Sequence, residues 1–194
     1  MNRLSLAAAF AAALSLSAGF ANAAPEKYLL DASHSQIVFT YNHLGFSTTT
    51  TMFSGFEGEI MFDAEAPAGS SVAVSFPVKT MLTGWEARFA HFMAPDFFGD
   101  HAGDMVEFTS TAINVTGDKT ADITGDLTLN GVTKPVTLKA ILNQAGQHPM
   151  AGKPWAGFDA SATVKRTDYN LGEFAPYVSD EVEIYISIEA MKAD

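Results

Sequence analysis

Apolar and polar residues alternate along segment after segment of this chain. The clearest run is DEVEIYISIEA, in which Val182, Ile184, Ile186 and Ile188 share one face and polar side chains take the other. A period of two is typical of a β-strand that packs one face against a core. The pattern recurs in about eight segments, which are 31–41, 56–62, 71–78, 106–115, 121–129, 136–140, 158–164 and 180–190.

Turn signals separate these segments. Asn130-Gly131 is typical of a tight β-hairpin turn, and Thr116-Gly117-Asp118 supplies a second turn. No internal repeat or linker interrupts the series. Many short strands joined by turns predict an all-β fold, either a sandwich or a barrel.

Segment 82–98 has a different period. We expect one short helix here, with Thr83 as its N-cap and Glu86 as the partner in a capping box. Pro95 limits this helix at Ala94. Its apolar side chains recur near helical spacing and would cover an open barrel end; they are Trp85, Phe89, Phe92 and Met93.

The N-terminal stretch, residues 1–23, has the pattern of a secretory signal peptide. Arg3 precedes an apolar run, and Ala21-Asn22-Ala23 forms an A-x-A cleavage site. The apolar run is short for a membrane anchor, which needs about 20 residues. We therefore expect cleavage before Ala24, export to the periplasm, and one domain over residues 24–194.

Composition excludes several classes of function. The chain has 22 acidic and 11 basic residues, so its formal net charge is −11. Such a chain will not bind nucleic acid through phosphate contacts or adhere electrostatically to anionic lipid. It has no cysteine, which rules out disulfides, thiol catalysis and Cys-type metal sites. Fifteen phenylalanines against five tyrosines and two tryptophans supply aromatic surface without a polar group.

The five histidines do not have the spacing of metal ligands. His34 and His43 bracket the first strand segment nine residues apart, His91 and His101 are ten apart, and His148 lies in a loop. Metal sites on one element use closer pairs. We predict no metal site: His34 would hydrogen-bond to backbone at one barrel end, and His43 would lie at the rim.

Catalytic patterns are also lacking. There is no G-x-S-x-G motif. Arg166 and Asp168 share a strand face, where we expect a structural ion pair. Two carboxylate pairs also share strand faces, which we interpret as solvated; they are Glu57 with Glu59 and Glu181 with Glu183. The sequence therefore predicts that the protein is not an enzyme.

Several motifs, in order along the chain, carry a family resemblance. They are Asp31-Ala32-Ser33-His34-Ser35 followed by His43, Pro95-Asp96-Phe97-Phe98, Phe108-Thr109-Ser110-Thr111, Gly125 to Val136, Lys165-Arg166-Thr167-Asp168-Tyr169 and Val178-Ser179-Asp180-Glu181-Val182. Together they resemble the YceI family of periplasmic polyisoprenoid-binding proteins. The chain departs from the usual family pattern at Ala90, Asp104 and Asn170.

The resemblance implies a fold and a ligand. The expected fold is an extended eight-stranded antiparallel β-barrel, lipocalin-like, with one short helix. The barrel would enclose an apolar pocket for an isoprenoid chain, such as a quinone tail, with no cofactor beyond that lipid. Polar groups at the rim, including Asn42, would orient a head group.

Twelve residues are the predicted ligand contacts, with His43 and Arg166 at the rim and Ala162 facing the tunnel. They are Ile37, Phe39, Tyr41, His43, Phe56, Ile60, Phe62, Phe89, Phe92, Phe108, Ala162 and Arg166. The residues alone leave two interpretations open, a packed core or a lined tunnel, and the resemblance favours the tunnel.

Three functions follow from these interpretations. The first is a carrier or storage protein for an isoprenoid lipid in the periplasm. The second is an enzyme or metal protein that uses the open barrel end. The third is a barrel with a filled core that acts through its surface, for example as accessory to a membrane electron-transfer protein. The sequence leaves homodimer formation open.

Overall fold

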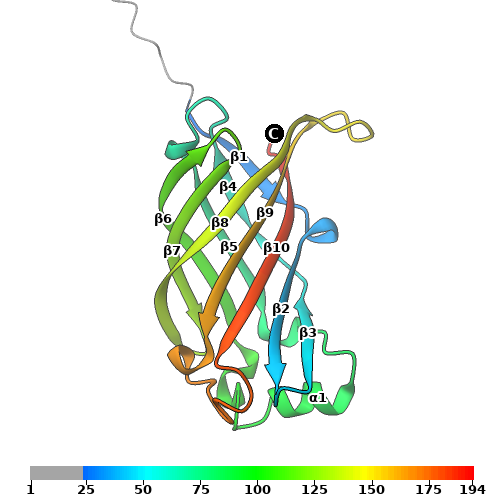
Figure 1. Ribbon diagram of the computed structural model, residues 1–194. Coiled ribbons are helices and arrows are strands. Elements are labelled where there is room, and N and C mark those ends of the chain that lie inside the picture. The colour runs from blue at the N-terminus through cyan, green and yellow to red at the C-terminus, as the bar shows by residue number, and fades with distance from the viewer. Residues whose placement is uncertain (1–23) are drawn as a thin grey trace, which may run out of the picture.

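Ten antiparallel strands form one continuous sheet that closes on itself (Figure 1). The computed structural model describes residues 24–194, and the predicted signal peptide, residues 1–23, lies outside them. The strands are β1 (Glu26–Leu30), β2 (Gln36–His43), β3 (Ser47–Phe53), β4 (Glu57–Phe62), β5 (Ser71–Pro77), β6 (Met105–Gly117), β7 (Thr120–Leu129), β8 (Val132–Gln147), β9 (Pro154–Lys165) and β10 (Glu181–Lys192).

The ten strands make a barrel of eight, because two barrel strands are each interrupted once. β1 and β2 both pair with β10, with Leu30 opposite Ala190 and Ile37 opposite Ile186. The short turn η1 (Ala32–His34) separates them. β4 pairs with β1 and β3 pairs with β2 in the same way. The predicted eight-stranded antiparallel barrel is confirmed.

The barrel wall opens between β3 and β5. One isolated bridge, Met52 to Leu82, joins β3 to the segment that follows β5. That segment contains α1 (Glu86–Phe92) and lies across the end of the barrel (Figure 1). We call this the α1 end, and the end that carries the C-terminus the opposite end. The predicted single short helix is therefore confirmed within residues 24–194.

The predicted capping box is wrong. Trp85 is the N-cap residue of α1, and it makes no side-chain cap hydrogen bond. The hydroxyl of buried Thr83 instead donates to the carbonyl of Trp85, at 2.8 Å. This bond turns the chain before the helix, so Glu86 is the first helical residue instead of the third. The helix ends at Phe92, two residues before the predicted limit.

Two apolar clusters pack in the barrel, one towards each end. The larger one, towards α1, is built around Phe56, Val78, Phe98 and Tyr169. The smaller one gathers Tyr28, Ile60, Phe62, Ala156 and Ala190 from β1, β4, β9 and β10. None of the helices described in residues 24–194 has the length and apolar character that a membrane-spanning helix requires.

Candidate ligand-binding cavity

The inward-facing side chains of the long strands are not fully buried. Ile184 and Ile186 on β10 stay partly exposed, as do Val136 and Leu138 on β8, although their neighbours along each strand face outward. Side chains packed on all sides would be closed to solvent. The barrel interior is therefore hollow, which does not fit the alternative of a filled core.

A cavity of about 290 Å³ runs through the barrel. This main cavity lies near the lower bound of small-molecule pockets, about 300 Å³. Its charged lining groups include Arg166 at the α1 end and Asp118 and Lys119 at the opposite end. The wall is made mostly of aliphatic and aromatic side chains, among them Ile37, Val72, Val74, Leu127, Val136, Leu138, Phe158, Ala160, Ile184 and Ile186.

A second cavity, of about 580 Å³, adjoins the main one at the α1 end. We call it the mouth. The two share five lining residues, which are Phe39, Phe92, Phe97, Arg166 and Val182. The mouth adds polar groups from Tyr41, His43, Arg88 and His91. A slender apolar ligand with a polar end would find matching surfaces in the main cavity and the mouth.

Ten of the twelve predicted contacts lie on these surfaces. The main cavity is lined by Ile37, Phe39, Phe56, Ile60, Phe62, Phe92, Phe108 and Arg166, and the mouth adds Tyr41 and His43. Phe89 lines neither, because α1 turns it against the larger core cluster. Ala162 also lines neither cavity, although it pairs with Ile184, which does line the main cavity.

A family model described as the YceI-like domain matches residues 28–190. The chain belongs to the YceI family. The match covers every strand except the first two residues of β1 and the last two of β10, so the predicted resemblance is confirmed over the whole barrel.

Curated relatives and solved structures agree with this assignment. Protein YceI of Escherichia coli O157:H7 is 39% identical over 181 residues, which cover 93% of this chain and 94% of the relative. A UPF0312 protein of Pseudomonas putida is 37% identical over 178 residues and covers 91% of each chain.

Two solved structures share the fold at low sequence identity. BcnA of Burkholderia cenocepacia has a TM-score of 0.74 at 23% identity, over 82% of this chain and 98% of BcnA. A domain of Saccharophagus degradans described as polyisoprenoid-binding has a TM-score of 0.66 at 16% identity, over 86% and 98% of the two chains. At these identities the likeness concerns the barrel fold alone.

Arg166 of this YceI chain holds a loop in place beside the cavity. Its guanidinium donates four hydrogen bonds of 2.6–3.0 Å to backbone carbonyls, which belong to Leu171, Glu173, Val178 and Ser179. Burial lowers the pKa of Arg166, against the attraction of Asp180. Four of its five N–H donors are occupied, so little remains for a ligand head group.

Two other sequence interpretations at the α1 end are corrected by the structure. Asp168 pairs with Lys134 at 2.6 Å instead of Arg166, because the short turn Arg166–Tyr169 points the two side chains to different partners. The Asn42 side chain accepts a hydrogen bond from the Gly45 amide at 2.7 Å and so shapes the β2–β3 turn. His43 remains exposed at the mouth, as predicted.

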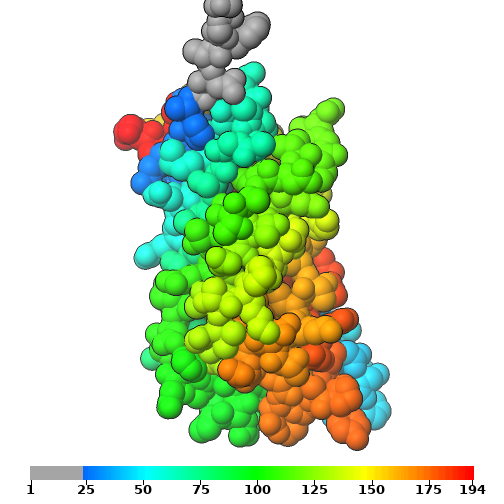
Figure 2. All heavy atoms as spheres, turned by 90° about the vertical axis from the view of Figure 1, so that its left-hand side faces the viewer, coloured from blue at the N-terminus to red at the C-terminus, as the bar shows by residue number. Residues whose placement is uncertain are grey.

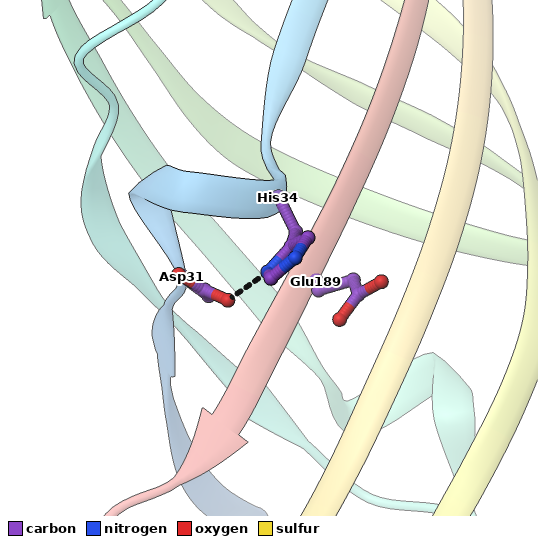
Figure 3. Close-up of side chains that lie close together, drawn as sticks. All are labelled: Asp31, His34 and Glu189. Atoms are coloured by element: carbon purple, nitrogen blue, oxygen red, sulfur yellow. Dashed lines mark hydrogen bonds and ion pairs between the residues drawn. The ribbon is translucent and has the colours of Figure 1, made fainter.

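His34 lies in a cluster of ionisable groups on the outer wall (Figure 3). Its Nδ1 is 2.6 Å from a carboxylate oxygen of Asp31, so the predicted bond to backbone is wrong. The hydrogen bond to Asp31 raises the pKa of His34. Burial raises the pKa of Asp31, but hydrogen bonds from Ser33 and His34 outweigh it and lower that pKa.

Glu189 completes this cluster, whose ligand-type atoms all lie within 4.8 Å of one another. Within residues 24–194 it is the one group of three such residues that could hold a metal ion. The spacing of the histidines in the sequence did not reveal this cluster, because β10 brings Glu189 to His34 from the far end of the chain (Figure 3). One Glu189 oxygen already accepts the indole N–H of Trp155 at 2.9 Å, so the cluster has structural partners.

The carboxylate pairs lie on the outer wall, away from both cavities. Glu57, Glu181 and Glu183 are exposed, and Glu59 pairs with Lys27. Residues that sequence reasoning missed lie at the mouth, namely Trp85, Arg88, His91, Phe97 and Phe174. The aromatic residues of segment 82–98 were the available signal for Trp85 and Phe97, whereas Arg88, His91 and Phe174 had none.

Proposed function

We propose that this YceI-family chain binds one isoprenoid lipid in the main cavity and carries or stores it in the periplasm. The observation that carries the proposal is an apolar cavity along the barrel that opens into a partly polar mouth. The barrel shared with a domain described as polyisoprenoid-binding supports it. Residues 1–23 support export, and N-terminal sequencing of the exported protein should begin at Ala24.

The energetics suit a ligand recognised mainly by its tail. Burial of one CH₂ contributes roughly 0.8 kcal/mol, so an isoprene unit of five carbons contributes about 3–4 kcal/mol at most. A micromolar complex needs about 8 kcal/mol net, after an immobilisation cost of several kcal/mol. A few buried units therefore suffice, and the head group needs only weak contacts with Tyr41 or His43 at the mouth.

A matched pair of ligands tests this division of affinity. Lipid-stripped protein is titrated with a benzoquinone that carries several isoprene units and with the same benzoquinone without a tail. We expect micromolar or tighter binding of the tailed compound and at least about a hundredfold weaker binding of the bare ring. Equal binding of both compounds, or binding of neither, would contradict the proposal.

The cavity also supports the proposal that the protein is a carrier and not an enzyme. Of the two histidines at the mouth, His91 packs against an aromatic ring, 5.1 Å from the Phe97 ring, centroid to centroid, and His43 is exposed. Within residues 24–194, no hydroxyl of a residue that lines either cavity hydrogen-bonds to an imidazole or a carboxylate, so no activated nucleophile is in place. Bound lipid should therefore be recovered chemically unchanged after incubation with the protein.

A further inference from the structure

Large apolar side chains are exposed around the mouth. Phe46 is 90% exposed, Tyr177 75% and Trp85 64%. Leu44, Leu82 and Phe174 are also about half exposed or more. Exposed apolar residues are unremarkable when scattered, but a contiguous group marks an interaction site.

These six residues come from three loops that meet at the α1 end. Leu44 and Phe46 lie on the β2–β3 turn, Leu82 and Trp85 precede α1, and Phe174 and Tyr177 lie in the loop held by Arg166. The Leu44 amide donates to the Tyr177 carbonyl at 3.0 Å. The Leu82 amide donates to Met52 of β3 at 2.8 Å.

The three loops border the cavity entrance. Figure 2 shows the β2–β3 turn, in blue, beside the orange segment near residue 175 at the lower end of the molecule. Trp85 and Phe174 line the mouth itself, together with His43, the last residue of β2. We call the six exposed residues the apolar ring.

The apolar ring is also free of formal charge. Residues 42–56, 80–85 and 174–179 contain no Asp, Glu, Lys or Arg, in a chain whose net charge is −11. Acidic residues begin just outside, at Glu86, Glu173 and Asp180. At the opposite end the loops carry Asp118, Lys119 and Lys153 instead. An acidic protein with one uncharged, aromatic end can bring that end to an anionic surface with the least repulsion.

We propose that the apolar ring docks on the surface of a lipid bilayer, so that the mouth opens into the membrane. The proposal rests on the proposed function, because a bilayer is where an isoprenoid lipid is dissolved. Passage of its tail through water would expose every CH₂ group to solvent, whereas a docked mouth keeps the tail in apolar surroundings. Trp and Tyr, which the apolar ring contributes at Trp85 and Tyr177, are the side chains enriched at the membrane–water interface.

The backbone of the three loops limits how deeply the apolar ring can enter a bilayer. The ring residues lie on turns whose backbone polar groups need water, so they reach the head-group region and not the hydrocarbon core. A few aromatic side chains at that depth give reversible attachment. The protein would therefore collect or deliver its lipid and then leave the membrane.

Vesicle co-sedimentation tests the docking surface. The probe is vesicles of phosphatidylcholine with phosphatidylglycerol, and the variant is Phe46→Ser with Tyr177→Ser, whose side chains line neither cavity. We expect the vesicle affinity of the double variant to fall about tenfold. The control is Ile141→Ser with Met150→Ser, which removes two exposed apolar residues outside the apolar ring and should leave vesicle binding unchanged.

Some results would contradict the docking proposal and leave the proposed lipid binding unaffected. Wild-type protein that does not sediment with vesicles, or a ring variant that sediments equally well, would contradict the proposal. So would self-association of the wild type that the ring variant abolishes, since the ring would then join two copies. The tailed benzoquinone, added from ethanol, should bind the ring variant with unchanged affinity; loss of that binding in wild type and variant alike would indicate failure of the proposed function instead.

Discussion

Arg166 binds the 171–179 loop through one side chain. Its four hydrogen bonds to carbonyls need a planar guanidinium, and the ammonium of lysine cannot reproduce them. We expect Arg166→Lys to lower the free energy of unfolding by about 3 kcal/mol, because several partly buried carbonyls lose a charged donor. Urea unfolding measures the change. Lys165→Gln, at the exposed neighbour, is the control, and an equal effect of the two substitutions would contradict this role.

His34 and Asp31 make stability depend on pH. The folded chain raises the pKa of His34 above its ordinary value of 6.5, so it holds the proton more tightly than the unfolded chain. The stabilisation is therefore full below pH 6.5 and is lost as pH rises through the raised pKa. The lowered pKa of Asp31 keeps its carboxylate charged below its ordinary value of 3.8.

His34→Gln tests this pH dependence. We expect the wild type to exceed the variant in Tm most between about pH 4 and 6.5, and the difference to shrink in alkaline solution. Glu189 faces the same imidazole and also favours its charged form. In Glu189→Gln the pKa of His34 should therefore be less raised, and the stabilisation should be lost at a lower pH than in the wild type. A Tm difference that stays constant from pH 5 to pH 9 would show that the ion pair contributes nothing.

The positions of single residues could be predicted from the sequence on strands, where the period of two fixes which side chains face inward. They could not be predicted in loops. Ile37, Phe39 and Ile60 follow from a period of two within one strand. The bonds of Arg166 and Asn42 depend on how loops fold back, and no local pattern encodes them. Glu189 reaches His34 only through the pairing of β10 with β1 and β2.

At the scale of elements, the sequence pattern did not predict the two interrupted barrel strands correctly. β3 reads STTTTMF, which lacks the apolar alternation used to find strands, although threonine favours strands by its branched Cβ. β1 has only five residues, and the turn at Ala32–His34 separates it from β2. The predicted first strand, 31–41, therefore merged that turn with β2 and missed β1.

Gly125 on β7 lets β6 and β7 approach closely inside the barrel. A Cβ there would lie 2.5 Å from both the Phe108 ring and the Thr109 carbonyl oxygen. We expect Gly125→Ala to destabilise the fold by about 1–3 kcal/mol through overpacking. Gly69→Ala is the control, since a Cβ at Gly69 meets nothing within 4 Å. Thermal unfolding compares them, and equal Tm values would contradict the close packing.

At the scale of the whole molecule, a hollow barrel should tolerate a larger inward-facing side chain with little loss of stability, whereas a filled barrel should be destabilised by it. Ala162, the position the sequence suggested, lines neither cavity, so the test moves to Ala160, which lines the main cavity opposite Ile186. We expect Ala160→Trp to abolish binding of the tailed benzoquinone with less than about 1 kcal/mol lost in stability. A filled interior would instead lose about 1–3 kcal/mol or more.

Ser161→Trp supplies the control for this substitution, because its side chain lies on the other face of β9. It should leave binding of the tailed benzoquinone intact. Loss of binding in both variants would mean that bulk anywhere on β9 distorts the barrel. Loss in Ala160→Trp alone would place the lipid tail in the main cavity.

The central claim is that the main cavity holds an isoprenoid lipid in the native protein. Mass spectrometry of an organic extract, taken from protein purified without detergent from its native source, tests this claim most directly. We expect close to one isoprenoid molecule per chain from the wild type and a strongly reduced amount from Ala160→Trp. An extract without lipid, or one that contains only unbranched fatty acyl chains at equal levels in both proteins, would contradict it.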